Sequence, residues 1–412
     1  MVSVHVSNAS LEAYESIVGE ALIEEIRMLA ERLSGKSVCH VNSTSFGGGV
    51  AEILHRLVPL MQDIGLNTEW KIIKGSHEFF GITKTIHNGL QGMNIPFTEQ
   101  MKRTYLKHNE MNAYKIDLDH DFVVIHDNQP AAIIYYRQKV GRWIWRCHID
   151  LSTPNQEFIK FITPLLLRYD SLIFTMKHFI PKRLESKKIA IIPPSIDPLS
   201  DKNKPMSESL VFSVLDKFDI DSERPIIAQV ARFDPWKDPL GVIDVYRLVK
   251  RKVPDVQLLL ISSMAKDDPE GWIYYEKTAR YAAQDYDIHL LTNLKGVGDI
   301  EVNAFQRASD VILQKSIREG FGLTVAEALW KETPVVGSNV GGISLQIIHG
   351  KTGFLVNSVE EAAQKTLYLL KHPTEAKEIG RRGKEHVLKN FLITKHLLDY
   401  LKLFVQLQDN HK

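Results

Sequence analysis

The sequence predicts an α/β protein built from two doubly wound parallel sheets of similar size. Short apolar runs alternate with loops rich in glycine or aspartate and with amphipathic segments, and this alternation is typical of parallel strands covered by helices. A polar stretch at 197–207 interrupts the alternation, which then begins again. The length of 412 residues also exceeds what a single core usually holds, which indicates two domains.

The first half contains five short apolar runs that predict strands. The first run, Ser37–Val41, is followed by a glycine-containing loop and then by apolar residues at helical spacing, which predict a helix that Pro59 should bend. In a parallel sheet covered by helices, ligands bind beyond the carboxyl ends of the strands. The other four strands are expected at Phe122–Ile125, Trp143–Trp145, Ser171–Phe174 and Ile189–Ile192.

The second half repeats the pattern after the polar stretch, which contains two prolines and is the best linker candidate. We expect an amino-terminal domain over 1–198, a carboxyl-terminal domain over 199–385 and a final helix over 386–412 that packs back on the first domain. The cleft between two such domains is the natural ligand site. Strands are expected at Ile226–Val230, Leu258–Ile261, Ile288–Leu291, Val311–Leu313 and Pro334–Val336, and a helical pattern runs from His372 to Leu407.

The composition argues against several classes of protein. An apolar content of 44% is too high for a disordered chain, and a net charge of +1 does not indicate a nucleic-acid-binding surface. No apolar run approaches the ~20 residues of a membrane span, and the start of the chain lacks the pattern of a secretory signal. Two cysteines without paired ligand spacing indicate neither a disulfide framework nor a metal site. We expect a cytoplasmic protein that binds neither nucleic acid nor membrane.

The strongest chemical signal is the segment 315–330, in which a predicted strand leads through Gly320 and Gly322 into a helix. Glycines at such a turn allow a ligand to approach the backbone, and the free amides at the helix start can hold an anion. Glu319 precedes the turn and should point into the cleft, while Glu327 lies one turn into the helix and can still face the same ligand. Each glutamate alone fits an ordinary surface or helix-start carboxylate, whereas the whole segment favours a ligand site.

A second signal follows the first strand of the second half, where Arg232 and Lys237 bracket a turn closed by Pro235 and Pro239. A guanidinium binds two phosphate oxygens at once, and an ammonium adds a mobile charge. An arginine and a lysine at this spacing are usually solvated charges. Beside the glutamate segment, they indicate a diphosphate site.

Three loops after first-half strands also carry polar or flexible groups. The run Phe46–Gly49 could cradle a phosphate or be a packing turn, since it has neither dinucleotide-binding nor Walker spacing. His126 and Asp127 lie at the end of one strand. An imidazole and a carboxylate can both form hydrogen bonds with sugar hydroxyl groups, although a histidine in a strand is more often a core residue. The run 145–150 ends another strand, and the face of Trp145 suits a pyranose ring. The polar candidates of that run are Arg146, His148 and Asp150.

The segment Glu319-Gly-Phe-Gly-Leu-Thr-Val-Ala-Glu-Ala, followed by Pro334-Val-Val-Gly and Gly341-Gly342, resembles the signature of the retaining nucleotide-sugar glycosyltransferases of family four. The resemblance covers nearly the whole chain and implies the GT-B fold of two Rossmann-like domains. It implies a donor sugar beside Glu319, a nucleotide ribose held by Glu327, and no catalytic metal. Arg232 and Lys237 would bind the leaving diphosphate. The other donor-binding residues that it implies are Gly48, Gly49, Gly320, Phe321, Gly322 and Leu323.

The first-half loops His126-Asp-Asn-Gln-Pro and Trp145-Arg-Cys-His-Ile-Asp resemble those of trehalose-forming members of this family, the glycosyltransferring trehalose synthases and the related retaining trehalose phosphorylases. The resemblance implies that glucose from ADP-, UDP- or GDP-glucose is joined to free glucose with retention, by a front-face displacement. The expected partners are these sugars and a second copy of the chain in a homodimer. The implied acceptor-binding residues are His126, Asp127, Arg146, His148 and Asp150.

Four alternatives stay open at this point. The same cationic pocket could bind inorganic phosphate in a trehalose phosphorylase, and another acceptor, such as sucrose or a lipid, could replace glucose. A non-catalytic binding module could share the fold, but the full set of donor-side cations and glutamates argues against lost catalysis. A dehydrogenase could share it too, and the missing dinucleotide fingerprint counts against that reading.

Overall fold

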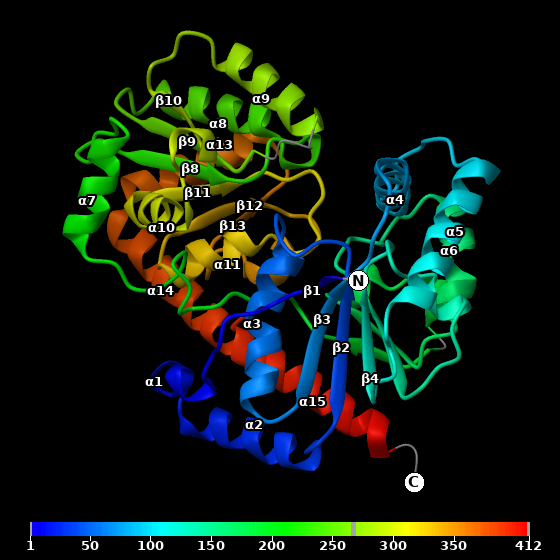
Figure 1. Ribbon diagram of the computed structural model, residues 1–412. Helices are drawn as coiled ribbons and strands as arrows, with labels where there is room; N and C mark the ends of the chain where they lie inside the picture. The colour runs from blue at the N-terminus through cyan, green and yellow to red at the C-terminus, as the bar shows by residue number, and fades with distance from the viewer. Residues whose placement is uncertain (1, 186, 265–268, 410–412) are drawn as a thin grey trace. The chain divides into compact units, whose positions relative to one another are not determined.

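Two compact units make up the protein, whose computed structural model describes residues 2–185, 187–264 and 269–409 (Figure 1). Unit 1 contains the chain up to Ser195 together with the residues from Ile393 onward, and unit 2 is Ile196–Leu392. The expected boundaries were 198 and 385. Each unit has one mainly parallel sheet with helices on both faces. The predicted α/β class with two doubly wound sheets is therefore confirmed.

The sheet of unit 1 has the order β1-β3-β2-β4-β5-β6-β7, in which β1 runs antiparallel to β3 and the other described pairs are parallel. The direction of chain progression reverses between β2 and β4. This is the topological switch point, where sheets of this kind bind ligands. The strands are β1 (Val2–Ser3), β2 (Ser37–Asn42), β3 (Asn67–Ile72), β4 (Phe122–His126), β5 (Arg142–Arg146), β6 (Ser171–Phe174) and β7 (Ile189–Ile191).

The helices of unit 1 cover both faces of its sheet, with α2, α3 and α15 on one side and α4, α5 and α6 on the other (Figure 1). The last helix begins at Ile393 rather than at 386, and it packs against α2 and α3. α3 continues through Pro59 to its end. The helices are η1 (Leu11–Tyr14), α1 (Glu15–Val18), α2 (Glu20–Arg32), α3 (Gly49–Asp63), α4 (His77–Leu90), α5 (Glu99–Lys115), η2 (Ile133–Tyr135), α6 (Gln156–Leu166), η3 (Lys177–Phe179), η4 (Lys182–Leu184) and α15 (Ile393–Asp409).

The sheet of unit 2 is parallel throughout its described strands, in the order β10-β9-β8-β11-β12-β13. Its first strand, β8, lies in the middle, because the chain adds strands first on one side and then on the other. The switch point lies between β8 and β11. The strands are β8 (Ile226–Val230), β9 (Gln257–Ser262), β10 (Ile288–Thr292), β11 (Val311–Gln314), β12 (Val335–Ser338) and β13 (Phe354–Val356).

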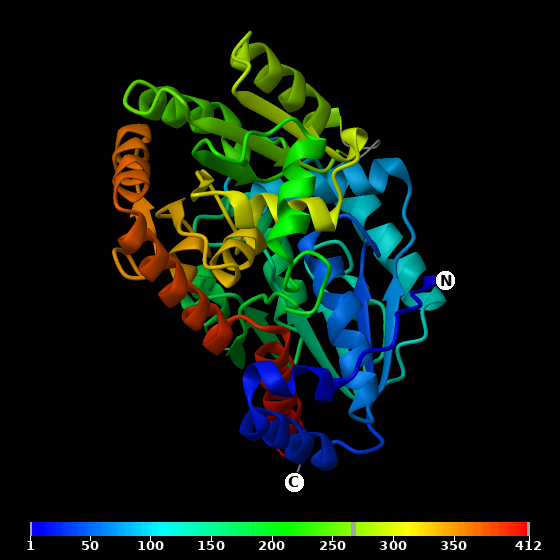
Figure 2. The ribbon, with the colours of Figure 1, turned by 90° about the vertical axis from the view of Figure 1, so that its left-hand side faces the viewer.

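The helices of unit 2 form two layers, with α8, α9 and α13 on one face of the sheet and α7, α10 and α11 on the other (Figures 1 and 2). In the described parts of the chain, no helix is both long enough and apolar enough to cross a lipid bilayer. The helices are α7 (Glu208–Lys217), η5 (Pro235–Lys237), α8 (Pro239–Lys250), α9 (Pro269–Ala282), η6 (Asn293–Lys295), α10 (Asp299–Ala308), α11 (Leu323–Trp330), α12 (Ile343–Gln346), α13 (Val359–Lys371) and α14 (Pro373–Asn390).

The polar stretch 197–207 is not the free linker that its composition predicts. Asn203 is fully buried, donates its Nδ2 to the carbonyl oxygen of Asp197 at 3.0 Å and accepts from Nζ of Lys331 at 2.8 Å. Asn303 of α10 donates to two further carbonyl oxygens of the stretch, each at 2.9 Å. These side chains satisfy the carbonyl groups of its turns, so the stretch is an integral part of unit 2.

Candidate active site

In each unit, most of the predicted site residues follow the strands that flank its switch point. In unit 1, the glycine run follows β2, and His126 and Asp127 lie at the end of β4. In unit 2, Arg232 and Lys237 follow β8, and Glu319 follows β11. The topology therefore gathers groups that are far apart in the sequence at one end of each sheet.

Lys237 and Glu319 are in direct contact in unit 2. Nζ of Lys237 donates a hydrogen bond to Oε2 of Glu319, and the Oγ of Ser316 donates to the same oxygen at 3.1 Å. Both charged side chains are mostly buried, which makes this a strong, charge-assisted interaction. The Nε2 of Gln229 on β8 donates to the carbonyl oxygen of Lys237 at 2.8 Å. Glu319 is thus held from two sides. The sequence pointed to Lys237 and Glu319 separately, but their contact and the bond from Ser316 were not predicted.

Two glycines shape the turn between Glu319 and α11. Gly322 has φ of +81°, and a Cβ on it would lie 3.2 Å from Cγ of Glu319. A Cβ on Gly342 would come within 2.3 Å of the Cα of Phe321. Within the described residues, the amides of 320–323 donate no backbone hydrogen bond. They stand at a helix start, where such amides can hold an anion.

Arg232 and Glu327 differ in their access to solvent. The side chain of Arg232 is 55% exposed, and its Nη2 lies 3.1 Å from Oδ2 of Asp234. Glu327 on α11 is 1% exposed, and its Oε1 lies 3.6 Å from Nζ of Lys202. Lys202 belongs to the polar stretch after the unit boundary, and no signal in the sequence pointed to it. The glutamate that was expected to bind a ribose is therefore itself one partner of an ion pair.

The glycine run after β2 is open rather than tightly packed. A Cβ on Gly48 would meet nothing within 4 Å, and its φ of 177° is ordinary extended backbone. Gly47, with φ of +76°, is the residue whose conformation favours glycine. Gly49 begins α3. Packing does not explain the glycine at position 48, which leaves the binding interpretation in place.

In unit 1, the alternation of β-strand side chains brings His40, His126 and Arg146 to the sheet face that α15 covers. Nδ1 of His40 lies 3.0 Å from Nε2 of His126, and Nδ1 of His126 lies 2.9 Å from Nε2 of His148. Tyr400 of α15 lies edge-on to His40, with ring centroids 6.0 Å apart. Sequence reasoning missed His40, although a histidine between Cys39 and Val41 in an apolar strand was a usable signal.

Burial keeps these imidazoles neutral. It lowers the pKa of His40 and that of His396 on α15 to about 3. The pKa values of His126 and His148 are held well below the usual value by burial, by the neighbouring imidazoles and by the positive charge of Arg146. These side chains therefore act as hydrogen-bonding groups and carry no charge at neutral pH.

Asp127 is held in a constrained position directly after β4. Its φ is +59°, a value that aspartate tolerates better than most residues. Its backbone N–H donates to the carbonyl oxygen of Arg146 at 2.8 Å, and its Oδ1 accepts from the backbone N–H of His148 at 2.7 Å. Burial raises the pKa of Asp127 to about 6, against the lowering effect of that hydrogen bond and of Arg146. The carboxylate is ionised at neutral pH and can accept a hydrogen bond from a hydroxyl group.

Three predicted or suggested sugar contacts, two at the end of β5 and one in the loop after it, differ in the structure. Trp145 is 1% exposed and donates its Nε1 to the carbonyl oxygen of Asp127 at 2.7 Å, so the prediction that its face stacks on a sugar is wrong. Arg146 is fully buried, and its positive charge helps to lower the pKa of the neighbouring His126 and His148. Oδ1 of Asp150 accepts from the backbone N–H of Ser152 at 2.8 Å and holds a turn.

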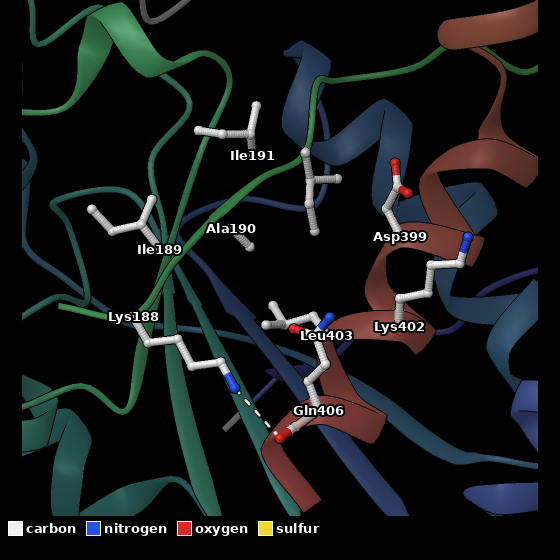
Figure 3. A pocket seen from close by; sticks show the side chains of 9 residues that line it. Lys188, Ile189, Ala190, Ile191, Asp399, Lys402, Leu403 and Gln406 are labelled. Carbon is white, nitrogen blue, oxygen red and sulfur yellow. Dashed lines mark hydrogen bonds between the residues drawn. The ribbon is translucent and has the colours of Figure 1, made fainter. Parts of the chain in front are cut away.

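A shallow hollow of about 260 Å³ lies between the edge strand β7 and α15 (Figure 3). The backbone of Ile189–Ile192 forms one side, while Asp399, Lys402 and Gln406 stand on the other. Nζ of Lys188 donates across it to the carbonyl oxygen of Gln406 at 3.4 Å. None of the predicted site residues lines this hollow, so it is separate from the candidate site.

Solved structures share the fold of this chain, and a family match adds the class of protein. A structure described as sucrose-phosphate synthase from Thermosynechococcus elongatus is 17% identical, with a TM-score of 0.70 over 91% of this chain and 100% of that one. A structure described as trehalose-6-phosphate from E. coli bound with UDP-2-fluoro glucose is 16% identical, with a TM-score of 0.73 over 90% and 99%. Residues 214–386 match the family described as "Glycosyl transferases group 1". The protein is a GT-B glycosyltransferase.

Sequence comparison then gives the family. Residues 40–181 match the family described as "Trehalose synthase, N-terminal domain". The chain is 60% identical to the trehalose synthase of Thermococcus litoralis over 95% of this chain and 96% of that one, and 50% identical to that of Rubrobacter xylanophilus over 98% of each. A trehalose phosphorylase of Pleurotus pulmonarius is 29% identical over 84% of this chain and 54% of that one. The chain belongs to the trehalose synthase family, which confirms the resemblance seen in the sequence.

Proposed function

We propose that the protein is a retaining glucosyltransferase that forms trehalose from a nucleoside-diphosphate glucose and free glucose. The observation that carries the proposal is the 60% identity to a trehalose synthase over 95% of the chain. The groups at the switch point of unit 2 support it, because they combine cations, a carboxylate and free amides.

Unit 2 would bind the donor. Arg232 and Lys237 would contact the diphosphate, and the amides of 320–323 would share its charge. Lys237 is oriented for this task by Glu319 and by the backbone bond to Gln229. These groups would stabilise the negative charge that develops on the leaving phosphate, which is the largest contribution that such a site makes to the rate.

Unit 1 would bind the acceptor glucose, with Asp127 accepting a hydrogen bond from one of its hydroxyl groups. The bond between the anomeric carbon and the phosphate oxygen breaks, while the bond to the acceptor oxygen forms on the same face. The proton of the acceptor hydroxyl passes to the departing phosphate. No protein side chain becomes covalently attached in this scheme, and the configuration at the anomeric carbon is retained.

Phosphorolysis of trehalose is the second candidate, because the chain is 29% identical to a trehalose phosphorylase over 84% of its length. Inorganic phosphate would occupy the position of the departing phosphate between Arg232 and Lys237. The bond from the anomeric carbon to the oxygen of the second glucose would break and a bond to a phosphate oxygen would form, which is the reverse of the bond change in the first candidate. The released glucose oxygen would take a proton from the phosphate.

One set of incubations tests both candidates. The protein is incubated with glucose and ADP-, UDP- or GDP-glucose, and separately with trehalose and inorganic phosphate. We expect trehalose with both anomeric centres in the α configuration from at least one nucleotide donor. Glucose 1-phosphate from the second incubation, with no product from any nucleotide sugar, would replace the proposal by the phosphorylase.

The remaining parts of the proposal concern the metal requirement, the cellular location, the ligands that are excluded and the oligomeric state. We propose that the enzyme needs no metal ion, works in the cytoplasm, binds neither nucleic acid nor membrane, and forms a homodimer. Cell fractionation tests the location. Light scattering on the purified protein tests the dimer, and a mass equal to one chain at working concentration would contradict it.

A further inference from the structure

Three histidines form a continuous hydrogen-bonded row in unit 1, which we call the histidine row: His40, His126 and His148. They come from β2, from the end of β4 and from the loop after β5. The two contacts, at 3.0 and 2.9 Å, both join an Nδ1 of one ring to an Nε2 of the next. His40 and His126 are buried, while His148 is partly exposed. The row thus leads from the interior of the unit toward a ring that a ligand can reach.

The histidine row permits only two arrangements of protons. All three rings are neutral at pH 7, because the pKa of His40 is about 3 and those of the other two are well below the usual value. A neutral imidazole carries one N–H donor and one bare nitrogen acceptor. Each of the two contacts needs one N–H donor and one bare nitrogen acceptor. Therefore all three rings carry hydrogen on Nδ1, or all three carry it on Nε2.

The inner end of the row decides between the two arrangements. Nε2 of His40 is buried and has no hydrogen-bond partner in the described part of the chain. With hydrogen on every Nε2, this atom would be a buried donor without an acceptor, which native proteins rarely leave unpaired. With hydrogen on every Nδ1, the same atom is an unpaired acceptor, and both N–H groups inside the row are satisfied.

We propose that His40 is a positioning residue that fixes the tautomer of His148 through His126, so that Nδ1 of His148 presents a hydrogen-bond donor to the bound sugar. This inference deepens the proposed function and rests on it for the identity of the sugar. His148 would recognise an oxygen that accepts, while Asp127, whose Oδ1 is 2.7 Å from the backbone N of His148, accepts from a hydroxyl group. The loops after β4 and β5 would therefore supply one acceptor and one donor, each of fixed direction.

Nitrogen NMR of the imidazole rings tests the tautomer directly. In wild-type protein labelled with ¹⁵N-histidine, we expect the Nδ1–H form for His148, with the signal assigned by its loss in His148→Ala. In His40→Leu, the row loses its inner donor, and we expect His148 to become a mixture of both forms. His40→Asn places an amide N–H where Nδ1 stood, and we expect it to restore the Nδ1–H form. An Nε2–H form in wild type, or no change in His40→Leu, overturns the proposal.

Kinetics then test whether the tautomer matters for binding. For His40→Leu, we expect the KM for glucose to rise roughly threefold to tenfold with a smaller change in kcat, the size expected for one lost hydrogen bond. His40→Asn should stay within about twofold of wild type. In the His148→Ala background, adding His40→Leu should have no further effect. An equal additional loss in both backgrounds would show a merely structural role for His40 and overturn the proposal.

A matched control separates positioning from folding. His120 is a buried histidine that stands just before the amino end of β4, at the opposite end of the same strand. His120→Leu should leave the KM for glucose and the tautomer of His148 unchanged. If His40→Leu does not fold, His40→Gln supplies a polar group at the wrong place and should behave as expected for the leucine variant. If the wild-type protein makes no trehalose, the proposed function fails, and the NMR result still decides the role of His40.

Discussion

Unit 2 concentrates charge at its switch point, whereas unit 1 concentrates neutral hydrogen-bonding groups. In unit 2, the Lys237–Glu319 ion pair and the exposed Arg232 follow the two central strands. In unit 1, a row of uncharged imidazoles runs beside one buried guanidinium and one carboxylate, Asp127, whose pKa is raised to about 6. The difference fits the proposed division of binding, in which unit 2 would hold an anion and unit 1 would select hydroxyl groups.

The largest effect should come from removing a cation in unit 2. Replacing Arg232 or Lys237 with Ala should lower kcat by about a hundredfold to a thousandfold, because each would stabilise charge that develops only on the leaving phosphate. Steady-state assays of trehalose formation measure the loss. Arg247→Ala, on the solvent-exposed side of α8, is the matched control and should keep its activity. Near-normal turnover in both test variants would remove the leaving-group role.

A smaller loss should follow when the carboxylate of unit 1 is neutralised. Asp127→Asn keeps the backbone conformation, since asparagine also tolerates positive φ, but it loses the ionised acceptor. We expect kcat/KM for glucose to fall roughly tenfold to a hundredfold at pH 7.5. In wild type, activity should decline as the pH falls below about 6, because Asp127 becomes protonated there. The variant should lack this decline, and the same acidic limb in both proteins would contradict the assignment.

The neutral cluster of unit 1 should make the fold sensitive to acid. Four histidines of unit 1, three of them buried and His148 partly exposed, have folded-state pKa values far below the unfolded value of about 6.5. The unfolded state therefore binds their protons first, and stability falls as the pH drops below about 6.5. Asp127 opposes this with one proton between pH 6 and 4, because its folded pKa is raised above the unfolded value. The net of about three protons corresponds to ~4 kcal/mol per pH unit.

Urea unfolding of wild type between pH 7 and 5 measures this slope. His40→Leu removes one of the four histidines and should make the slope shallower by ~1.4 kcal/mol per pH unit. Identical slopes for the two proteins would show that the buried histidines do not set the acid sensitivity.

The smallest effect should come from metal removal. Because side chains and amides would carry the phosphate charge, we expect dialysis against EDTA to leave kcat and KM within about twofold of their starting values. Re-addition of Mg²⁺ is the control. Loss of activity that Mg²⁺ restores would show that the cations of unit 2 are not sufficient.

Most of the fold follows from the sequence because apolar runs mark buried parallel strands. Ser171–Phe174 and Ile226–Val230 agree with the observed strands to the residue, and the class is confirmed. β3 was missed because Glu69 and Lys71 interrupt its apolar pattern, yet the two pair with each other at 2.6 Å. The stretch 197–207 was misread as a linker because its polar side chains bind backbone carbonyl groups of its own unit.

The candidate site residues could be predicted where they belong to a short sequence motif. Contacts between residues that are distant in the sequence could not be predicted. Glu319 and Lys237 stood in recognisable segments, but their contact spans 82 positions of sequence. His40 was missed although a histidine in an apolar strand was a usable signal, because its contact with His126 depends on which strand lies beside β2. The roles assigned to the site residues stay predictions until the variants above are measured.

The split of unit 1 into two stretches of sequence bears on how the chain reaches its native state during synthesis. Unit 2 is one continuous stretch, Ile196–Leu392, so all of its strands have been made before α15 is translated. Unit 1 starts first but lacks the helix that covers His40 and Arg146 until residues 393–409 have been made. Domains tend to fold as units during translation. The amino-terminal unit is therefore completed last, and until then its polar face lacks the cover of α15.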